Sequence, residues 1–357
     1  MRKKKLLHIV EAMGGGVFTY IVELSNQLVE KYDIYIAYAT RPQTPENFRD
    51  YFDDRIKLIE VENFSRSVNI LSDVKAFFEI KNIVKKINPD VVHLHSSKAG
   101  ALGRWCINGR KIPMFYTPHG FSFLMADQNK LKLKIYKAIE KVCSFRKCTT
   151  IACSKGEYNE AIKLNKRATY VNNGINKYEL DITLRSISKN EIKGFTVFTL
   201  GRICYQKNPE LFNKIAQSLP DVKFLWIGDG ELRNKLTSPN IEVTGWVDRK
   251  TALIYAFSAN AFMLTSLWEG LPISLLEAMY MKKLCIVSNV IGNRDVIKTL
   301  CNGFCCDTEN DFIDAINFAK DKDCNELISN ARNEVLSKYN TEVMAKKYNE
   351  IYQNALE

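Results

Sequence analysis

Long apolar runs are missing from this 357-residue sequence. No stretch of about 18 apolar residues exists, so we expect no membrane-spanning helix. The basic start, residues 1–5, resembles the beginning of a signal peptide, but the apolar run behind it is too short for one. We therefore expect residues 6–10 to form the first strand of a cytoplasmic protein.

Paired cysteine spacings are missing as well, although the sequence has ten cysteines. Cys143, Cys148 and Cys153 recur every five residues without histidine partners, and Cys305 stands next to Cys306. These spacings argue against a zinc site and against a disulfide framework, and they favour reduced cytosolic thiols. We expect no metal and no cofactor.

Acidic residues are scarce in the first half of the chain. The formal net charge is +11; residues 1–175 carry 29 Lys and Arg against 17 Asp and Glu, and residues 176–357 carry 22 against 23. The first half therefore suits an anionic partner, although a generally lysine-rich surface is the alternative. No RNA- or DNA-binding module is recognisable, so nucleic acid is not an expected partner. The sequence sets no oligomeric state.

Short apolar strands alternate with helical stretches in both halves, which predicts parallel sheets covered by helices. We expect two Rossmann-like domains, 1–177 and 178–339, with a polar, weakly structured linker near 178–193. Asn208 and Pro209 are typical of a helix start. The expected strands are 6–10, 34–39, 91–94, 114–117, 149–153, 195–200, 223–227, 261–264 and 284–287, and the expected helices are 17–31, 70–87, 130–143, 209–218 and 274–281.

Two segments that follow strands are candidates for binding phosphate. Gly14-Gly15-Gly16 lies between the first strand and the first helix, where backbone N–H groups and the helix dipole favour an anion. It lacks the full G-x-G-x-x-G spacing, and a tight turn without a ligand is the alternative. After the strand near 195–200, Arg202 and Lys207 flank a helix start and suit a diphosphate. Solvated surface cations are the alternative.

A pair of glutamates is the strongest candidate for binding a sugar. Glu269 lies on a predicted loop and Glu277 lies eight positions later on the helix that follows. Carboxylates accept hydrogen bonds from vicinal hydroxyls, so a sugar and a ribose are natural partners. The backbone N–H groups of residues 270–274 suit phosphate oxygens. Solvated surface charge is the alternative for each glutamate.

Taken in order, these motifs resemble those of the family 4 retaining glycosyltransferases, in particular the bacterial enzymes of capsule and O-antigen synthesis. The resemblance covers essentially the whole chain and rests on residues 14–16, 90–100, 117–121, 172–175, 201–208, 228–230 and 269–279. It implies the GT-B fold: two doubly wound α/β domains facing across a cleft, with a C-terminal helix, 340–357, returning to the first domain. One departure concerns residues 291–294, where the family often has a Gly-Gly pair.

The resemblance also implies roles for individual residues. Glu269 would hold the transferred sugar, Glu277 the donor ribose, and Arg202 and Lys207 the diphosphate. His119 would lie by the donor sugar; a turn histidine is the alternative. The expected catalytic residues are Glu269, His119, Arg202 and Lys207. The other expected donor-binding residues are Gly15, Gly16, Val247, Gly270, Leu271, Pro272, Ile273 and Glu277, and the expected acceptor-side residues are Ser96, Ser97 and Lys98. Trp246 would lie near the base, or in the core.

Family membership implies a metal-independent transferase that moves a hexose or N-acetylhexosamine with retention of configuration. A front-face reaction is the usual proposal, in which the departing phosphate helps to deprotonate the acceptor hydroxyl. The resemblance favours a UDP-sugar donor and a polyprenyl-diphosphate-linked glycan as acceptor. The alternatives are a soluble acceptor, a sugar-nucleotide epimerase of the same fold, or a nucleotide-sugar binder without turnover.

Residues 128–148 are rich in lysine, with interleaved Leu131, Leu133, Ile135, Ile139 and Val142. This pattern predicts a basic amphipathic helix that lies on an anionic membrane surface. We therefore expect a cytoplasmic protein that is peripheral at the inner face of the cell membrane. A surface helix whose apolar side packs on the sheet is the alternative.

Overall fold

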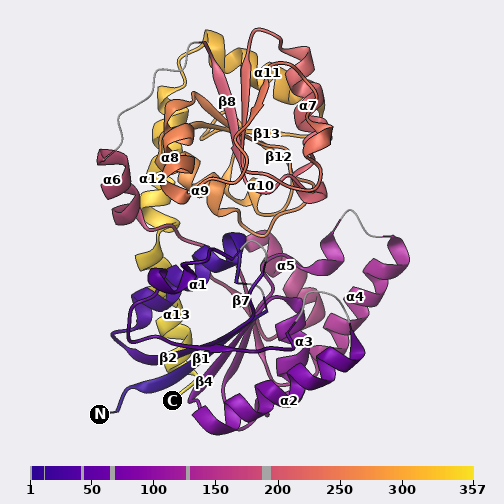
Figure 1. The fold of residues 1–357 in the computed structure, drawn as a ribbon, viewed down its shortest axis with the longest axis vertical. Coiled ribbons are helices and arrows are strands. Elements are labelled where there is room, and N and C mark those ends of the chain that lie inside the picture. Colours follow the sequence, from indigo (N-terminus) through magenta and orange to yellow (C-terminus); the bar gives the residue numbers. More distant parts are fainter. Residues whose placement is uncertain (1, 12, 42–43, 65–68, 126–128, 187–193) are drawn as a thin grey trace. The chain divides into compact units, whose positions relative to one another are not determined.

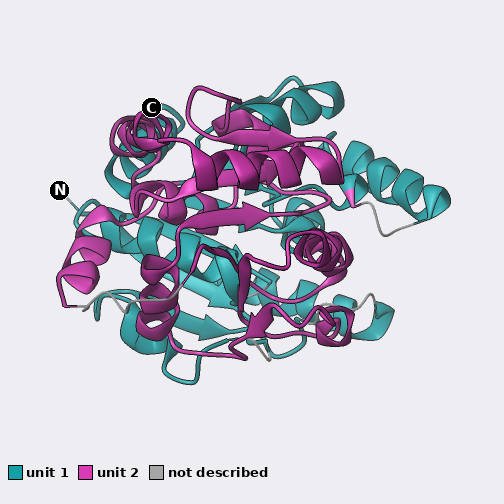
Figure 2. Cartoon of the chain, turned by 90° about the horizontal axis from the view of Figure 1, so that it is seen from above, with its two compact units in different colours: residues 1–124, 128–173, 341–357 teal, residues 125–127, 174–340 magenta. Residues whose placement is uncertain are grey.

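The computed structural model describes residues 2–11, 13–41, 44–64, 69–125, 129–186 and 194–357. The chain forms two compact units, which are coloured separately in Figure 2. Unit 1 comprises residues 1–124, 128–173 and 341–357, and unit 2 comprises residues 125–127 and 174–340. Each unit has its own parallel sheet and its own hydrophobic core.

Within the described residues, unit 1 has a seven-stranded sheet in the order β3-β2-β1-β4-β5-β6-β7. The chain moves outward from β1 to β3 and then returns to the other side of β1 with β4, as in a doubly wound fold. The switch point therefore lies between β1 and β4, where Val10 pairs with His95. The strands are β1 (Lys4–Val10), β2 (Tyr32–Tyr38), β3 (Lys57–Glu60), β4 (Val91–His95), β5 (Met114–Thr117), β6 (Thr149–Ala152) and β7 (Ala168–Tyr170).

Helices cover both faces of this sheet, which is why its strands are apolar on both sides (Figure 1). In β1, Leu6 and Val10 belong to one core, while Leu7 and Ile9 belong to the other. The helices of unit 1 are α1 (Gly15–Leu28), α2 (Ile70–Ile87), α3 (Ser97–Cys106), α4 (Lys130–Cys143), α5 (Lys155–Leu164) and α13 (Thr341–Asn354).

The C-terminal helix α13 is part of the core of unit 1, which confirms the expectation that it returns to the first domain. Figure 1 shows it in yellow beside β1 and β2. Tyr348 and Tyr352 are fully buried, and the Tyr20 hydroxyl of α1 donates to the Tyr348 hydroxyl. The last helix of the chain therefore helps to hold the first strand and the first helix in place.

Unit 2 repeats the doubly wound order with six described strands, β10-β9-β8-β11-β12-β13. Its switch point lies between β8 and β11. The strands are β8 (Thr196–Leu200), β9 (Lys223–Ile227), β10 (Ile241–Val243), β11 (Ala261–Leu264), β12 (Leu284–Ser288) and β13 (Phe304–Cys306). The helices are α6 (Lys177–Arg185), α7 (Pro209–Ser218), α8 (Arg249–Ser258), α9 (Ile273–Tyr280), α10 (Asn293–Val296), α11 (Glu309–Asp321) and α12 (Asn325–Lys338). The Asn208 side chain caps α7 through the Leu211 N–H, as predicted.

The predicted linker is in part wrong, because residues 177–185 form helix α6. Asn176 caps this helix by accepting the Glu179 N–H at 3.2 Å. Leu180 is 1% exposed, and Asp181 accepts the Tyr280 hydroxyl at 2.8 Å. These contacts attach the segment to unit 2. The rest of the predicted linker, residues 187–193, lies outside the described residues.

All ten cysteines are free thiols in the structure. Among the described residues, every helix is too short or too polar to span a bilayer.

Candidate active-site residues

In unit 2, two loops meet at the carboxyl edge of the sheet, beside the switch point between β8 and β11. Lys207 ends the turn after β8, and Glu269 lies on the loop after β11. Nζ of Lys207 lies 2.7 Å from Oε1 of Glu269, and the two side chains are 16% and 8% exposed. The Leu267 N–H donates to the Gln206 carbonyl at 2.8 Å, and the Thr265 hydroxyl donates to the Lys207 carbonyl at 2.8 Å. The structure thus brings two of the predicted catalytic residues into direct contact.

Helix α9 begins directly after this ion pair. Pro272 is its N-terminal cap and offers no side-chain hydrogen bond, so the cap residue does not pair the first N–H groups of the helix. Leu271 is buried, which fixes the turn between Glu269 and Ile273. A left-handed Gly292 (φ 87°) packs so closely on the Gly270 carbonyl that a Cβ would collide with it. A carboxylate, a cation and a helix N-terminus therefore lie together, an arrangement that suits an anionic ligand.

Glu277 is held by a cation that sequence reasoning missed. It lies on α9 with its side chain 4% exposed, and Arg249 at the start of α8 donates to it at 2.8 Å. Arg249 also lies 3.2 Å from Glu179 of α6. The Glu277 and Glu179 carboxylates raise the pKa of Arg249 above its usual range. The Glu277 side chain is therefore held in place by Arg249.

Arg202 does not share a partner with Lys207. Its guanidinium makes two hydrogen bonds to Glu231, at 2.7 and 2.9 Å, and the Glu231 hydrogen bond raises the pKa of Arg202. The Glu231 side chain is 51% exposed. An exposed ion pair is worth about 0–1 kcal/mol, so a diphosphate can replace Glu231 at little cost.

The loop at Gly228 packs against the Gly201 turn in unit 2, and the loop at Gly245 pairs with the Gly228 loop. Gly228 (φ 134°) lies against the Gly201 carbonyl, and a Cβ there would collide with it. Gly245 (φ 73°) forms an isolated bridge with Gly228. Trp246 follows and is 61% exposed, so the alternative of a core aromatic is wrong. Val247 is half-buried. An exposed indole is suited to stacking on a nucleotide base.

In unit 1, the predicted glycines lie at the carboxyl end of β1. Gly15 (φ 57°) and Gly16 form the first turn of α1 and do not precede the helix as the sequence suggested. A Cβ at either glycine would meet no atom within 4 Å, so this backbone faces open space. Gly14 provides no side-chain cap. The helix start is therefore accessible to an anion.

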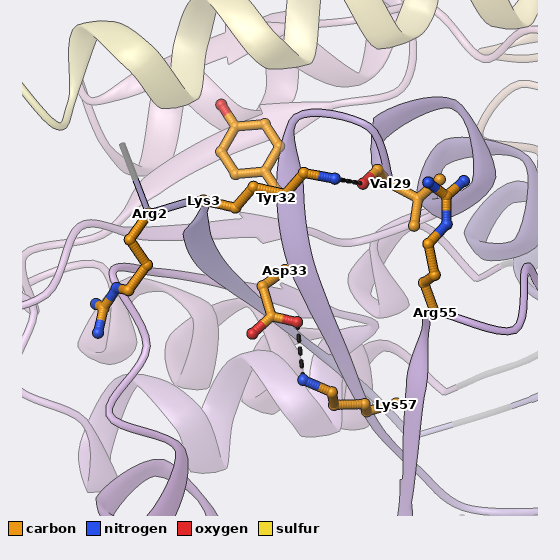
Figure 3. Close-up of a pocket in the computed structure, with 7 residues that line it drawn as sticks. All are labelled: Arg2, Lys3, Val29, Tyr32, Asp33, Arg55 and Lys57. Carbon is orange, nitrogen blue, oxygen red and sulfur yellow. Dashed lines mark hydrogen bonds and ion pairs between the residues drawn. The ribbon is translucent and has the colours of Figure 1, made fainter.

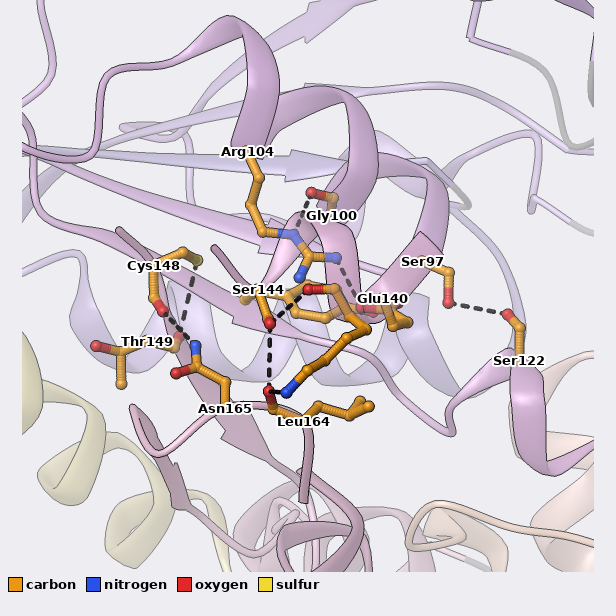
Figure 4. A network of polar contacts seen from close by, with 12 residues as sticks. Ser97, Gly100, Arg104, Ser122, Glu140, Ser144, Cys148, Thr149, Leu164 and Asn165 are labelled. Carbon is orange, nitrogen blue, oxygen red and sulfur yellow. Dashed lines mark hydrogen bonds and ion pairs between the residues drawn. The ribbon is translucent and has the colours of Figure 1, made fainter. Parts of the chain in front are cut away.

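The predicted acceptor residues follow β4 and begin helix α3, so two of them lie on a helix and not on a loop. Ser96 has an unusual backbone conformation, with φ at 76°. Ser97 Oγ lies 2.9 Å from Ser122 Oγ, and Figure 4 shows this contact. Lys98 Nζ lies 2.6 Å from Asp73. Only Ser96 is at the switch point itself, where strained backbone is typical of functional sites.

His119 lies in a turn after β5, and its ring is hydrogen-bonded. It has a left-handed backbone (φ 56°), as does Gly120 (φ 96°). The Gly120 N–H donates to Glu157 at 2.7 Å, and Glu157 is fully buried. Nε2 of His119 lies 3.1 Å from Nδ1 of His95. Burial lowers the pKa of His119 to about 3, so the imidazole is neutral at physiological pH.

One group of side chains has the composition of a metal site. Ligand atoms of His8, His93 and His95 lie within 4.8 Å of one another. Both ring nitrogens of His93 are used by hydroxyls, Tyr352 at 2.6 Å and Thr117 at 2.8 Å. His95 bonds an imidazole through each ring nitrogen. Five of the six ring nitrogens of these three histidines therefore take part in a hydrogen-bonded network.

A cavity of about 430 Å³ is lined by none of these residues (Figure 3). It is at the amino-terminal ends of β1 and β2 and includes the Asp33–Lys57 ion pair, 2.9 Å long. Doubly wound sheets bind ligands at the carboxyl ends of their strands. We therefore assign no substrate to this cavity.

Comparison with known proteins assigns the chain to a family. Residues 14–178 match the model of Glycosyltransferase Family 4, and residues 182–334 match that of Glycosyl transferases group 1. The chain is 31% identical over 338 residues, 85% of each chain, to UDP-Gal:alpha-D-GlcNAc-diphosphoundecaprenol alpha-1,3-galactosyltransferase of Escherichia coli. The chain belongs to the family 4 glycosyltransferases.

A further relative and a solved structure are also similar to this glycosyltransferase, and the solved structure bears on the fold alone. The glycosyltransferase is 23% identical to N,N'-diacetylbacillosaminyl-diphospho-undecaprenol alpha-1,3-N-acetylgalactosaminyltransferase of Campylobacter jejuni, over 96% of this chain and 97% of the other. Sucrose-phosphate synthase from Thermosynechococcus elongatus matches its structure with a TM-score of 0.81, 16% identity, and coverage of 98% and 99%. The predicted fold class, an α/β chain with two Rossmann-like domains of the GT-B kind, is confirmed.

Some partners of the glycosyltransferase's candidate residues were missed in the sequence. Glu231 follows the 228–230 loop directly, so that loop was a usable signal. No sequence signal pointed to Arg249, because its spacing from Glu277 along the chain does not predict that the two side chains are in contact. His8 and His95 lie on neighbouring strands at the switch point, where paired strands bring their side chains together.

Proposed function

We propose that this glycosyltransferase moves a hexose or N-acetylhexosamine from a UDP-sugar to a polyprenyl-diphosphate-linked glycan. The reaction retains the anomeric configuration and serves capsule or O-antigen synthesis at the inner face of the cell membrane. The names of the Escherichia coli and Campylobacter jejuni relatives support the lipid-linked acceptor, and the first also supports UDP. The observation that carries the proposal is the Lys207–Glu269 pair at the start of α9.

In the proposed donor complex, the diphosphate lies against Lys207 and the first N–H groups of α9. The phosphate then shares the positive charge of Lys207, and the Glu269 carboxylate accepts hydrogen bonds from sugar hydroxyls. Glu277, oriented by Arg249, accepts from the ribose. Arg202 leaves Glu231 and joins the diphosphate. Charge that develops on the leaving diphosphate is stabilised by fixed cations and dipoles, which are already oriented before reaction.

Lys207 and Arg202 together supply two positive charges to the leaving group, as a divalent cation does in other transferases. We therefore propose that turnover needs no metal. The departing diphosphate oxygen takes the proton of the acceptor hydroxyl on the same face of the sugar. Catalysis then consists of positioning and charge stabilisation.

The acceptor side of the proposal rests on helix α4 of unit 1. Leu131, Ile135, Ile139 and Val142 are 67, 49, 45 and 49% exposed, so the alternative that they pack on the sheet is wrong for these four. The lysines at 130, 132, 134, 137 and 141 are exposed as well. On an anionic lipid surface, the apolar side chains would enter the acyl boundary and the lysines would attract the headgroups.

The helix presents this face because its opposite side is fixed. Glu140 is 5% exposed and accepts from Arg104 of α3 and from the Tyr116 hydroxyl, each at 2.7 Å; Figure 4 shows the contact with Arg104. Helix α3 also contacts α2, whose Ile70 and Leu71 are 78 and 77% exposed. The start of α2, which α3 separates from α4, therefore carries exposed apolar side chains as well.

Flotation with liposomes tests the membrane face. Each basic residue near an anionic surface contributes about 1 kcal/mol, so K130Q together with K134Q is expected to lower binding roughly 30-fold. L131S with I135S is expected to weaken binding to anionic vesicles as well. Y178S with I182S, an equally spaced exposed pair on α6, is the matched control and is expected to bind like the wild type. Equal binding to neutral and anionic vesicles, or none to either, contradicts the proposed surface.

The acceptor itself is tested by comparing one glycan diphosphate with and without its polyprenyl chain. We expect the lipid-linked form to be glycosylated at much lower concentration, and added anionic vesicles to lower its apparent KM further. Equal use of the two forms would favour the soluble-acceptor alternative.

A further inference from the structure

All four histidines of the chain lie together in unit 1. His8 is on β1, His93 and His95 are on β4, and His119 follows β5. His8, His93 and His95 are fully buried, whereas His119 is partly exposed. Every histidine of this protein therefore belongs to one cluster at the switch point of unit 1.

Three of the four form a linear hydrogen-bonded chain. Nδ1 of His8 lies 2.9 Å from Nε2 of His95, and Nδ1 of His95 lies 3.1 Å from Nε2 of His119. The rings of His95 and His119 are stacked, with centroids 5.3 Å apart. His93 stands outside this chain, because both of its nitrogens bond hydroxyls. His95 therefore links a fully buried imidazole to a partly exposed one.

The chain has a direction that can be worked out from its buried end. Desolvation lowers the pKa of each of these imidazoles, so each is neutral and has one N–H and one lone pair. Both hydrogen bonds must then run the same way. Nε2 of His8 is buried and has no hydrogen-bond partner among the described residues. A buried N–H without a partner is rarer in proteins than a buried lone pair without one, so the His8 proton belongs on Nδ1.

It follows that His8 donates to His95 and that His95 donates to His119 Nε2. His119 must then carry its own proton on Nδ1, and the described residues include no hydrogen-bond partner for that atom. We propose that His8 and His95 are positioning residues, which fix His119 in the Nδ1–H tautomer so that it donates a hydrogen bond to a ligand oxygen. This inference rests on the proposed function insofar as the oxygen belongs to the donor's sugar or diphosphate.

The group that orients His119 is the imidazole of His95 and not a carboxylate. A catalytic histidine is commonly oriented by a carboxylate, which stabilises the charged imidazolium. Here the neighbours of the chain are neutral: His93, and the ring of Tyr20 with its centroid 4.6 Å from that of His119. The buried Glu157 bonds the backbone of Gly120. The arrangement therefore suits a neutral hydrogen-bond donor and not a general acid.

Nuclear magnetic resonance of protein labelled with ¹⁵N at histidine tests the tautomers directly. All signals come from this cluster, because the chain has no other histidine, and single substitutions assign them. We expect His8, His95 and His119 each to be protonated at Nδ1 and unprotonated at Nε2. A His119 signal protonated at Nε2, or one averaged between two tautomers, overturns the proposal whether or not the protein turns over a sugar nucleotide.

Kinetics of matched variants separate a positioning role from a structural one. H95F removes the donor to His119, and we expect kcat/KM for the donor to fall about fivefold to tenfold, the worth of one neutral hydrogen bond. In H95N the amide can donate from the position of Nδ1, so we expect kcat/KM close to that of the wild type. H93F is the control, because it replaces an equally buried imidazole that lies outside the hydrogen-bonded chain of His8, His95 and His119.

Equal losses in H95F and H93F, or no rescue in H95N, overturn the positioning role. If H95F does not fold, the wild-type spectrum still decides the tautomer. A wild-type protein without activity towards any UDP-sugar contradicts the proposed function, whereas the tautomer of His119 is settled by its spectrum alone.

Discussion

Replacing Lys207 with methionine removes the cation that lies 2.7 Å from the Glu269 carboxylate. Breaking a fully buried ion pair costs about 3–5 kcal/mol, and the partial exposure of both side chains lowers our expectation to about 2 kcal/mol. E269Q leaves the opposite charge unpaired and is expected to cost a similar amount. The double variant has no unpaired charge, so its free energy of unfolding is expected to return to within about 1 kcal/mol of the wild type.

Activity is expected to fall in both single variants and to stay low in the double variant. If Lys207 binds the diphosphate and Glu269 binds the sugar, each single change lowers kcat/KM by about 100-fold to 1,000-fold, as for other groups that stabilise transition-state charge. The double variant regains stability but not activity. Urea unfolding and release of nucleotide diphosphate measure the two effects on the same preparations. Recovery of activity in the double variant would refute the reasoning, because it would make the pair a structural ion pair only.

Three further changes follow from the same structure. R249M leaves Glu277, 4% exposed, without its cation; because Arg249 itself is 32% exposed, we expect the free energy of unfolding in urea to fall by about 2 kcal/mol, and an unchanged midpoint contradicts this. The pKa of His8 is lowered from 6.5 to about 3 by burial, so unfolding takes up a proton between these values. Stability is expected to be full above pH 6.5 and to fall by about 1.4 kcal/mol per pH unit below it for this residue alone; a flat profile from pH 6.5 to 5 contradicts this. G292A places a Cβ against the Gly270 carbonyl at φ 87°, and we expect a loss of about 1–3 kcal/mol in thermal unfolding together with weaker donor binding; wild-type values for both contradict this.

The sequence predicted the alternation of strands and helices because buried parallel strands are short, apolar runs. The helix at 70–87 and the strand at 223–227 were predicted with their observed bounds. Helix α6 was missed because its sequence is polar and its stability comes from contacts of Leu180 and Asp181 with the rest of unit 2. Local pattern cannot reveal a helix that depends on such tertiary contacts.

The sequence predicted which residues are candidates for the site, but it did not predict which side chains contact one another. Glu269 and Lys207 were expected to bind different parts of one ligand, and the structure pairs them with each other. Arg249 was not predicted, because its contact with Glu277 joins two helices that are separated by a strand and a loop. Spacing along the chain gives the candidates, whereas the partners of each candidate depend on the strand order, which places β8 beside β11.

The most direct test of the account is a panel of nucleotide sugars, given to the purified protein in EDTA with an undecaprenyl-diphosphate-linked sugar as acceptor. We expect release of UDP from one donor, and loss of that release in E269A and K207A variants that still fold. No release with any donor, or release only after a metal is added, would contradict the proposed metal-independent transferase.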